Sequence, residues 1–134
     1  LKYFRKQKNQ HRTTSPHETA IAELKSAAEL TADDNERFAV LSSLALRRYF
    51  ETGKGMHTLG KTTDEFLKSM RTHSMLNAEA RKSLAECLQR CDQVKFARES
   101  LARADRLKLT ESALAVIQEC EATQSEKDVQ HVQS

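Results

Sequence analysis

The sequence predicts an all-α fold, a small bundle of about five helices with a short third helix and no sheet. Apolar residues recur every three or four positions along most of the 134 residues. Three glycines and one proline are too few for the tight turns of an all-β fold. The length supports one modest core rather than two, and no stretch approaches the roughly 18 consecutive apolar residues of a membrane span.

The first two helices are predicted from their start signals. Ser15 followed by Pro16 has the form of an N-cap with proline in the first helical position, and this helix should extend to about Leu30. Thr31 and Asp34 have the spacing of a capping box, which predicts that a second helix opens there. The second helix should end near residue 52, because glycines follow at 53 and 55.

The remaining helices follow the same logic. Thr62 and Glu65 form a second capping box and predict the short third helix. Asn77 is expected to cap a fourth helix, and a fifth should begin between residues 100 and 105 and end near Thr123. The fifth helix is expected to bury Leu107, Leu114, Ile117 and Cys120. The predicted core comprises Phe38, Leu41, Tyr49, Phe66, Leu84, Leu88, Val94 and Phe96.

Basic residues are concentrated at the start of the chain. Residues 1–12 contain five cations and no acid, and these cations are Lys2, Arg5, Lys6, Lys8 and Arg12. The rest of the chain contains the other 17 of the 22 basic residues and all 19 acidic residues, so it is mildly acidic. Apolar and aromatic residues mixed with cations are typical of the cytoplasmic flank of a transmembrane helix. We therefore expect a basic juxtamembrane-like arm at 1–15, a helical domain at 16–123 and a disordered polar tail at 124–134.

Two motifs indicate alternative functions. The segment 55–62 matches the phosphate-binding loop G-x-x-x-x-G-K-T, in which Lys61 would contact the outer phosphates. No buried strand is predicted before it, so glycines that end one helix and a threonine that caps the next explain the same residues. The third and fourth predicted helices also have the order of a helix-turn-helix, with Arg81 and Lys82 opening the recognition helix. The acidic balance of the domain argues against DNA binding.

The cysteines do not predict a metal centre or a disulfide framework. Three occur, Cys87, Cys91 and Cys120, without the spacing of zinc ligands and without a nearby histidine on the same predicted helix. We expect free, buried thiols in a reducing compartment. No catalytic residue, cofactor or metal site is expected.

Three segments together resemble a known family. They are residues 46–51 (LRRYFE), 62–67 (TTDEFL) and 92–97 (DQVKFA), and their order and spacing are similar to those in the cytoplasmic region of bacterial Bat-type membrane proteins and their relatives. Genes of that family lie beside those of MoxR-type AAA ATPases and von Willebrand factor A-domain proteins. The motif residues are Arg47, Arg48, Tyr49, Thr62, Glu65, Phe66, Asp92, Lys95 and Phe96. From their positions we expect Arg47 or Arg48 to form a salt bridge with Asp92 or Asp64, and the alternative is that both arginines are solvated.

The resemblance implies a function without catalysis. It describes a protein-protein interaction module that forms the cytoplasmic domain of a single-span bacterial protein, at the cytoplasmic face of the inner membrane. It implies an AAA ATPase or a von Willebrand A-domain protein as partner, and membrane attachment through a preceding transmembrane helix and the basic arm. Nucleic acid is not an expected partner, and nucleotide or nucleic-acid binding stays as the alternative function.

Overall fold

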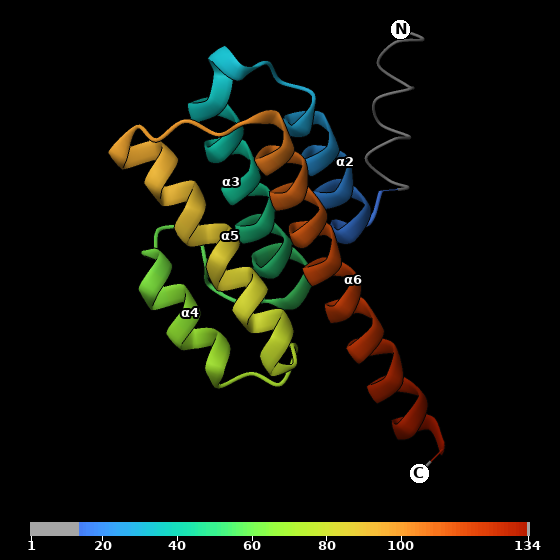
Figure 1. Cartoon of the computed structure of the whole chain (residues 1–134). Coiled ribbons are helices and arrows are strands. Elements are labelled where there is room, and N and C mark those ends of the chain that lie inside the picture. Colours follow the sequence, from blue (N-terminus) through green and yellow to red (C-terminus); the bar gives the residue numbers. More distant parts are fainter. Residues whose placement is uncertain (1–13, 134) are drawn as a thin grey trace, which may run out of the picture.

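A computed structural model describes the backbone of residues 14–133 and the side chains of residues 14–125 except Ala32 (Figure 1). This part of the chain is all-helical, with a short third α-helix and no strand, as the sequence predicts. Most of the basic arm, up to residue 13, lies outside the described residues. The elements are α2 (Pro16–Ala28), the 3₁₀ turn η1 (Ala32–Asp34), α3 (Asn35–Lys54), α4 (Thr63–Arg71), α5 (Ala78–Ala97) and α6 (Arg103–Gln133).

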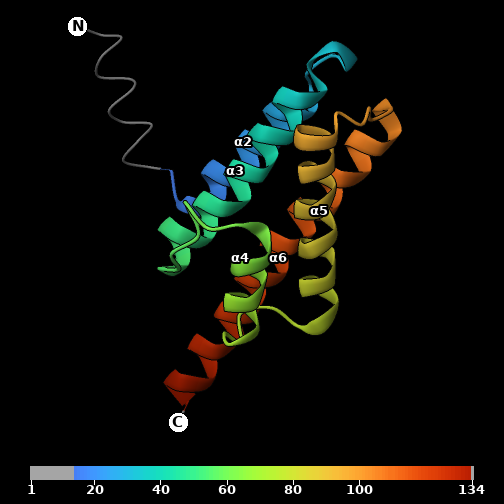
Figure 2. The ribbon, with the colours of Figure 1, turned by 90° about the vertical axis from the view of Figure 1, so that its left-hand side faces the viewer.

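Four helices surround one core, and α4 packs outside them. Helix α2 contacts α3 and α6, and α5 contacts the same two helices, so the four contacts close a ring. Helix α4 lies against α5 and runs in the opposite direction (Figure 2). The C-terminal part of α6 extends beyond the other helices in both views. The arrangement leaves α4 and the end of α6 as the elements with the fewest neighbours.

The core is built from the apolar stripes that the sequence predicts for α3, α4 and α5. The largest fully buried side chains are aromatic, and Phe50 contacts both Tyr49 and Phe66 edge-on, with ring centroids 5.0 and 5.6 Å apart. Leu41 is only half-buried. The predicted face of α5 is buried along its whole length at Ala80, Leu84, Cys87, Leu88, Cys91 and Val94.

Two predicted core residues are in fact exposed. Phe96 is 79% exposed, because it follows Val94 by two residues and therefore lies on the opposite side of α5. Leu107 is 42% exposed, since the buried stripe of α6 passes through Leu109, Ala113, Val116, Ile117 and Cys120. Leu114 lies at the edge of this stripe and is half-buried.

The helix ends also differ from prediction in places. Helix α2 ends at Ala28 rather than Leu30, and α6 continues to Gln133 rather than ending near residue 123. The expected disorder of residues 124–134 stays a prediction. The capping box predicted at Thr31 does not form. Its hydroxyl donates to the Asp34 carboxylate at 3.5 Å instead of accepting a backbone N–H, and α3 begins only at residue 35.

Gly53 does not end α3 as predicted. The helix continues to Lys54, and Gly55 ends it in the left-handed conformation with φ of 70°. A Cβ atom at position 53 would lie only 3.1 Å from the Cβ of Pro16. Gly53 therefore allows the start of α2 to approach the end of α3 closely.

Candidate functional site

The three sequence motifs meet around the side chain of Arg47. From α3, its guanidinium donates to the backbone carbonyl oxygens of Lys61 (2.7 Å) and Thr58 (3.2 Å) and to the hydroxyl of Thr63 (3.0 Å). The Thr63 hydroxyl donates in turn to the carboxylate of Asp92 on α5, at 2.6 Å. We call these five residues the Arg47 clamp. The clamp ties the end of α3, the loop before α4 and the last turns of α5 to one another.

The predicted arginine-aspartate salt bridge is wrong in its direct form. Within the described residues, neither arginine forms an ion pair with Asp92 or Asp64. Arg47 reaches Asp92 through the hydroxyl of Thr63, which occupies the space between them. Arg48 points to the other side of α3 and pairs with Glu23 of α2 at 3.4 Å. Burial lowers the pKa of Arg47, and the negative charge of Asp92 offsets part of that effect.

The other motif residues hold α4 and the end of α5 in place. Thr62 and Glu65 form the predicted capping box, and the hydrogen bonds from Thr62 lower the pKa of the Glu65 carboxyl. The guanidinium of Arg47 lies over the ring of Phe66, 5.6 Å from its centroid. Lys95 pairs with Asp92 at 3.4 Å, and its ammonium also lies 5.3 Å from the centroid of the exposed Phe96 ring. The polar motif groups are thus engaged mainly with one another.

The loop 55–62 uses its backbone amides internally. The carboxylate of Glu51 accepts from the N–H groups of Thr58 (3.1 Å) and Leu59 (3.2 Å). The N–H of Met56 donates to the carbonyl of Phe50, and the ammonium of Lys61 donates to a serine hydroxyl on α4. In a phosphate-binding loop these amides point to the phosphates. Here a protein carboxylate already occupies part of that position and would repel a second anion.

A second polar cluster joins α2, α3 and α6. The buried Tyr49 hydroxyl donates to the carboxylate of Glu121, which also pairs with Lys54 at 2.9 Å and with His17 at 3.4 Å. Burial and the bond to Glu121 raise the pKa of Tyr49. Burial alone would raise the pKa of Glu121, but the bonds from Tyr49 and Lys54 outweigh it and lower that pKa. Sequence reasoning missed this cluster, because 72 residues separate Tyr49 from Glu121 and no local pattern links them.

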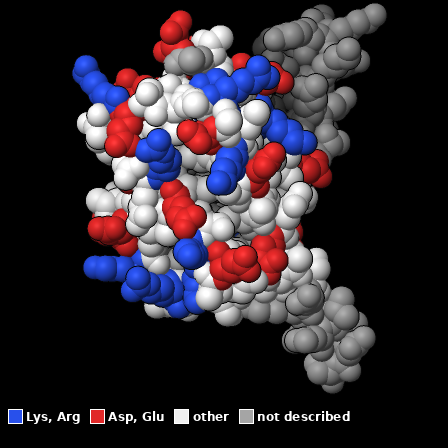
Figure 3. Space-filling model, in the orientation of Figure 1, with Lys and Arg blue, Asp and Glu red and all other residues white. Residues whose placement is uncertain are grey.

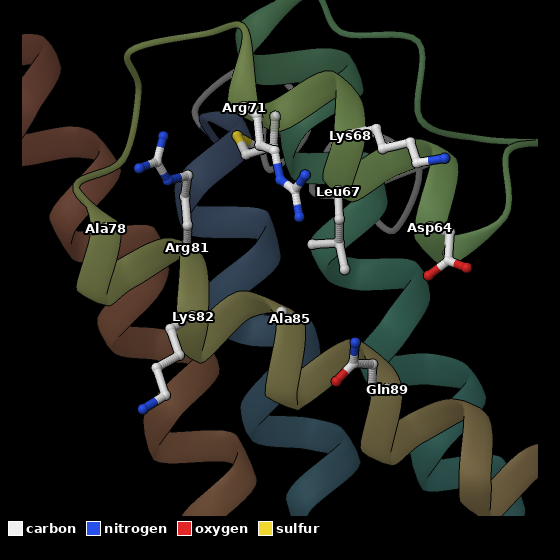
Figure 4. Close-up of a pocket in the computed structure, with 10 residues that line it drawn as sticks. Asp64, Leu67, Lys68, Arg71, Ala78, Arg81, Lys82, Ala85 and Gln89 are labelled. Carbon is white, nitrogen blue, oxygen red and sulfur yellow. The ribbon is translucent and has the colours of Figure 1, made fainter.

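A hollow with a volume of about 590 Å³ lies between α4 and α5. Leu67 points into it from α4, opposite Ala85 on α5 (Figure 4). Arg71 and Arg81 reach toward this space from the two helices, while Lys68 and Lys82 lie at its margins. Four basic side chains and one acidic side chain line this hollow, which we call the basic groove.

The cations of the basic groove are largely unpaired. Within the described part of the chain, the side chains of Arg71, Arg81 and Lys82 form no hydrogen bond or ion pair. Elsewhere on the face seen in Figure 3, acidic and basic side chains alternate, whereas basic ones gather over the end of α4 and the turn into α5. The basic groove is therefore a local positive region on a mixed surface.

The cysteines behave as core residues. All three are buried, and burial raises the pKa of Cys87 and of Cys91 to about 12. Among the described residues there is no group of three or more His, Cys, Asp or Glu side chains that could hold a metal ion. In the same part of the chain, no helix has both the length and the apolar character that crossing a membrane requires.

Comparisons of the chain with protein-family models, with curated proteins and with solved structures gave no match.

Proposed function

We propose that this chain is a helical protein-interaction module without a catalytic role, placed beside a membrane. The observation that carries this proposal is how the motif residues are used. Arg47, Thr63 and Asp92 bind one another and fix the positions of α3, α4 and α5, so these polar groups act in the fold. The groups that stay available to a partner are the cations of the basic groove and the exposed ring of Phe96. Arginine and aromatic side chains are enriched at protein-protein interfaces, which favours a protein partner for this surface.

The membrane location rests on the basic arm and on the family resemblance. Each of the five arm cations contributes about 1 kcal/mol of attraction near an anionic membrane surface. The remaining residues carry a small net negative charge, so the arm rather than the bundle should contact lipid. The Bat-type resemblance supports, as part of this proposal, a location at the cytoplasmic face of the bacterial inner membrane and an AAA ATPase or a von Willebrand A-domain protein as partner.

Two measurements test this proposal. Vesicles of phosphatidylglycerol should retain the chain at low salt and lose a variant in which the five arm cations are replaced by glutamine. The purified AAA ATPase and von Willebrand A-domain protein of the source organism should bind the chain and this variant equally in solution. The proposal fails when neither protein binds, or when binding requires the arm cations.

The alternative functions have less support. Glu51 occupies the amides that a nucleotide phosphate would need, which disfavours the phosphate-loop interpretation. Arg81 faces the basic groove shared with α4, and the antiparallel arrangement of α4 and α5 differs from the crossed helices of a helix-turn-helix. Tight binding of duplex DNA with a steep dependence on salt would favour the nucleic-acid function instead.

A further inference from the structure

Two arginines line the basic groove, one from each helix. Arg71 comes from the last turn of α4, where the helix dipole favours a cation, but Arg81 follows directly on the first turn of α5, where the dipole disfavours one. The Arg71 side chain extends into the space between the helices, and the Arg81 side chain rises from α5 beside the turn that joins them (Figure 4). No acidic group of the described residues pairs with either. Each guanidinium group is therefore open to a carboxylate of a ligand, which can accept two hydrogen bonds from it.

The groove also offers an apolar floor. Leu67 is half-buried and points into the space, and the small side chain of Ala85 on the facing helix leaves room above it. A ligand that fits both features has an apolar side chain for the floor and carboxylates for the arginines. A free phosphate has no apolar part that could pack on Leu67, and a flat bilayer surface does not enter a concave groove.

We propose that the basic groove binds an acidic amphipathic segment of a partner protein. Carboxylates of the segment pair with Arg71 and Arg81, Lys68 and Lys82 attract further acidic residues at the margins, and an apolar side chain packs on Leu67. This inference rests on the proposed interaction role and names the surface and the chemistry of the partner.

The probe is a labelled helical peptide of about four turns, with leucine on one face and glutamate at the other positions. Its affinity for the full chain is measured by fluorescence anisotropy. The Arg71→Glu/Arg81→Glu variant should bind the peptide at least about tenfold more weakly than wild type. The matched control, Lys25→Glu/Arg37→Glu, changes two exposed cations of α2 and α3. It has the same net charge as the Arg71→Glu/Arg81→Glu variant, and its basic arm is unchanged. It should bind within about twofold of wild type.

Two further measurements locate the contact. A peptide with glutamine in place of glutamate should lose most of the affinity, and Leu67→Ala should weaken the binding of the acidic peptide. Backbone amide shifts on titration should centre on residues 64–89. The inference is overturned when both charge-reversal variants lose affinity equally, when the shifts lie outside 64–89, or when phosphatidylglycerol vesicles or duplex DNA bind through Arg71 and Arg81 in preference to the peptide.

The outcomes separate this inference from the proposed function. If the candidate partner proteins bind the Arg71→Glu/Arg81→Glu variant as well as wild type and the peptide does not bind, the interaction role stands and the groove assignment fails. If the peptide binds at the groove and neither candidate protein binds, the groove assignment stands and the proposed function fails.

Discussion

Replacing Thr63 by valine removes one hydroxyl from the centre of the Arg47 clamp and keeps the size and branching of the side chain. Thr63 is 8% exposed, and its hydroxyl accepts from Arg47 and donates to Asp92. A hydrogen bond to a charged group contributes about 1.5–3 kcal/mol, so the two bonds give an upper limit of about 3–6 kcal/mol. Arg47 keeps its bonds to two carbonyls, and the Asp92 side chain is 30% exposed and can be hydrated. We therefore expect Thr63→Val to destabilise the fold by about 2 kcal/mol.

The assay is urea unfolding monitored by far-UV circular dichroism. The variant should have a lower midpoint and an unchanged slope of the unfolding free energy against urea concentration. The control is Thr52→Val on the exposed side of α3, where the hydroxyl bonds only to a carbonyl of its own helix. This control should stay within about 0.5 kcal/mol of wild type. A double-mutant cycle of Thr63→Val with Asp92→Asn should show a coupling of about 1 kcal/mol. A cost for Thr63→Val no larger than that of the control would refute the clamp.

Thr62→Ala should lower the free energy of unfolding by about 1 kcal/mol, because the helix cap is lost, whereas Lys61→Ala should leave it nearly unchanged. Saturable ATP binding by the wild type would contradict this interpretation of the loop. Leu84→Ala removes a fully buried side chain and should cost about 2–5 kcal/mol in the same urea assay. Glu121→Gln should lower the free energy of unfolding by about 1 kcal/mol at neutral pH, a modest loss because this side chain is partly exposed and its charge is screened by water. The lowered pKa of Glu121 means that its carboxylate stabilises the fold above pH 4.5, so wild type and variant should converge in thermal stability as the pH falls below that value. The thiols of Cys87, Cys91 and Cys120 are buried, so the rate at which they react with a disulfide reagent should be limited by the rate of unfolding.

Local patterns predicted most of the fold. A cap at Ser15, Thr62 or Asn77 needs only the residue and the N–H groups one turn later, and all three caps form. The cap at Thr31 fails, because the side chain of Asp34 takes the hydroxyl as donor and the chain makes a 3₁₀ turn before α3. Local signals therefore located helix starts well, except where a neighbouring side chain competed for the capping group.

The site was less predictable, because it depends on which faces meet. The sequence predicted that Arg47 or Arg48 would pair with Asp92 or Asp64, but it could not show which pair would meet or that Thr63 lies between Arg47 and Asp92. The exposure of Phe96 was missed for a different reason. Its aromatic ring suggested burial, but a residue two positions after Val94 lies off the buried stripe of α5, so the helical period alone could have predicted that it is exposed. Long-range contacts such as that between Tyr49 and Glu121 have no local signature at all.

The Arg47 clamp and the basic groove are physically linked through α4. This helix has only nine residues and packs on α5 outside the four-helix ring, so its own contacts with the core are few. The clamp fixes its first residue, Phe66 and Met70 bury its inner face, and the groove lies between α4 and α5. A rigid α4 keeps Arg71 at a constant position relative to α5, so a ligand would not have to order the groove on binding. The residues of the Arg47 clamp thus lie away from the proposed binding surface and support it by holding α4 in one position relative to α5.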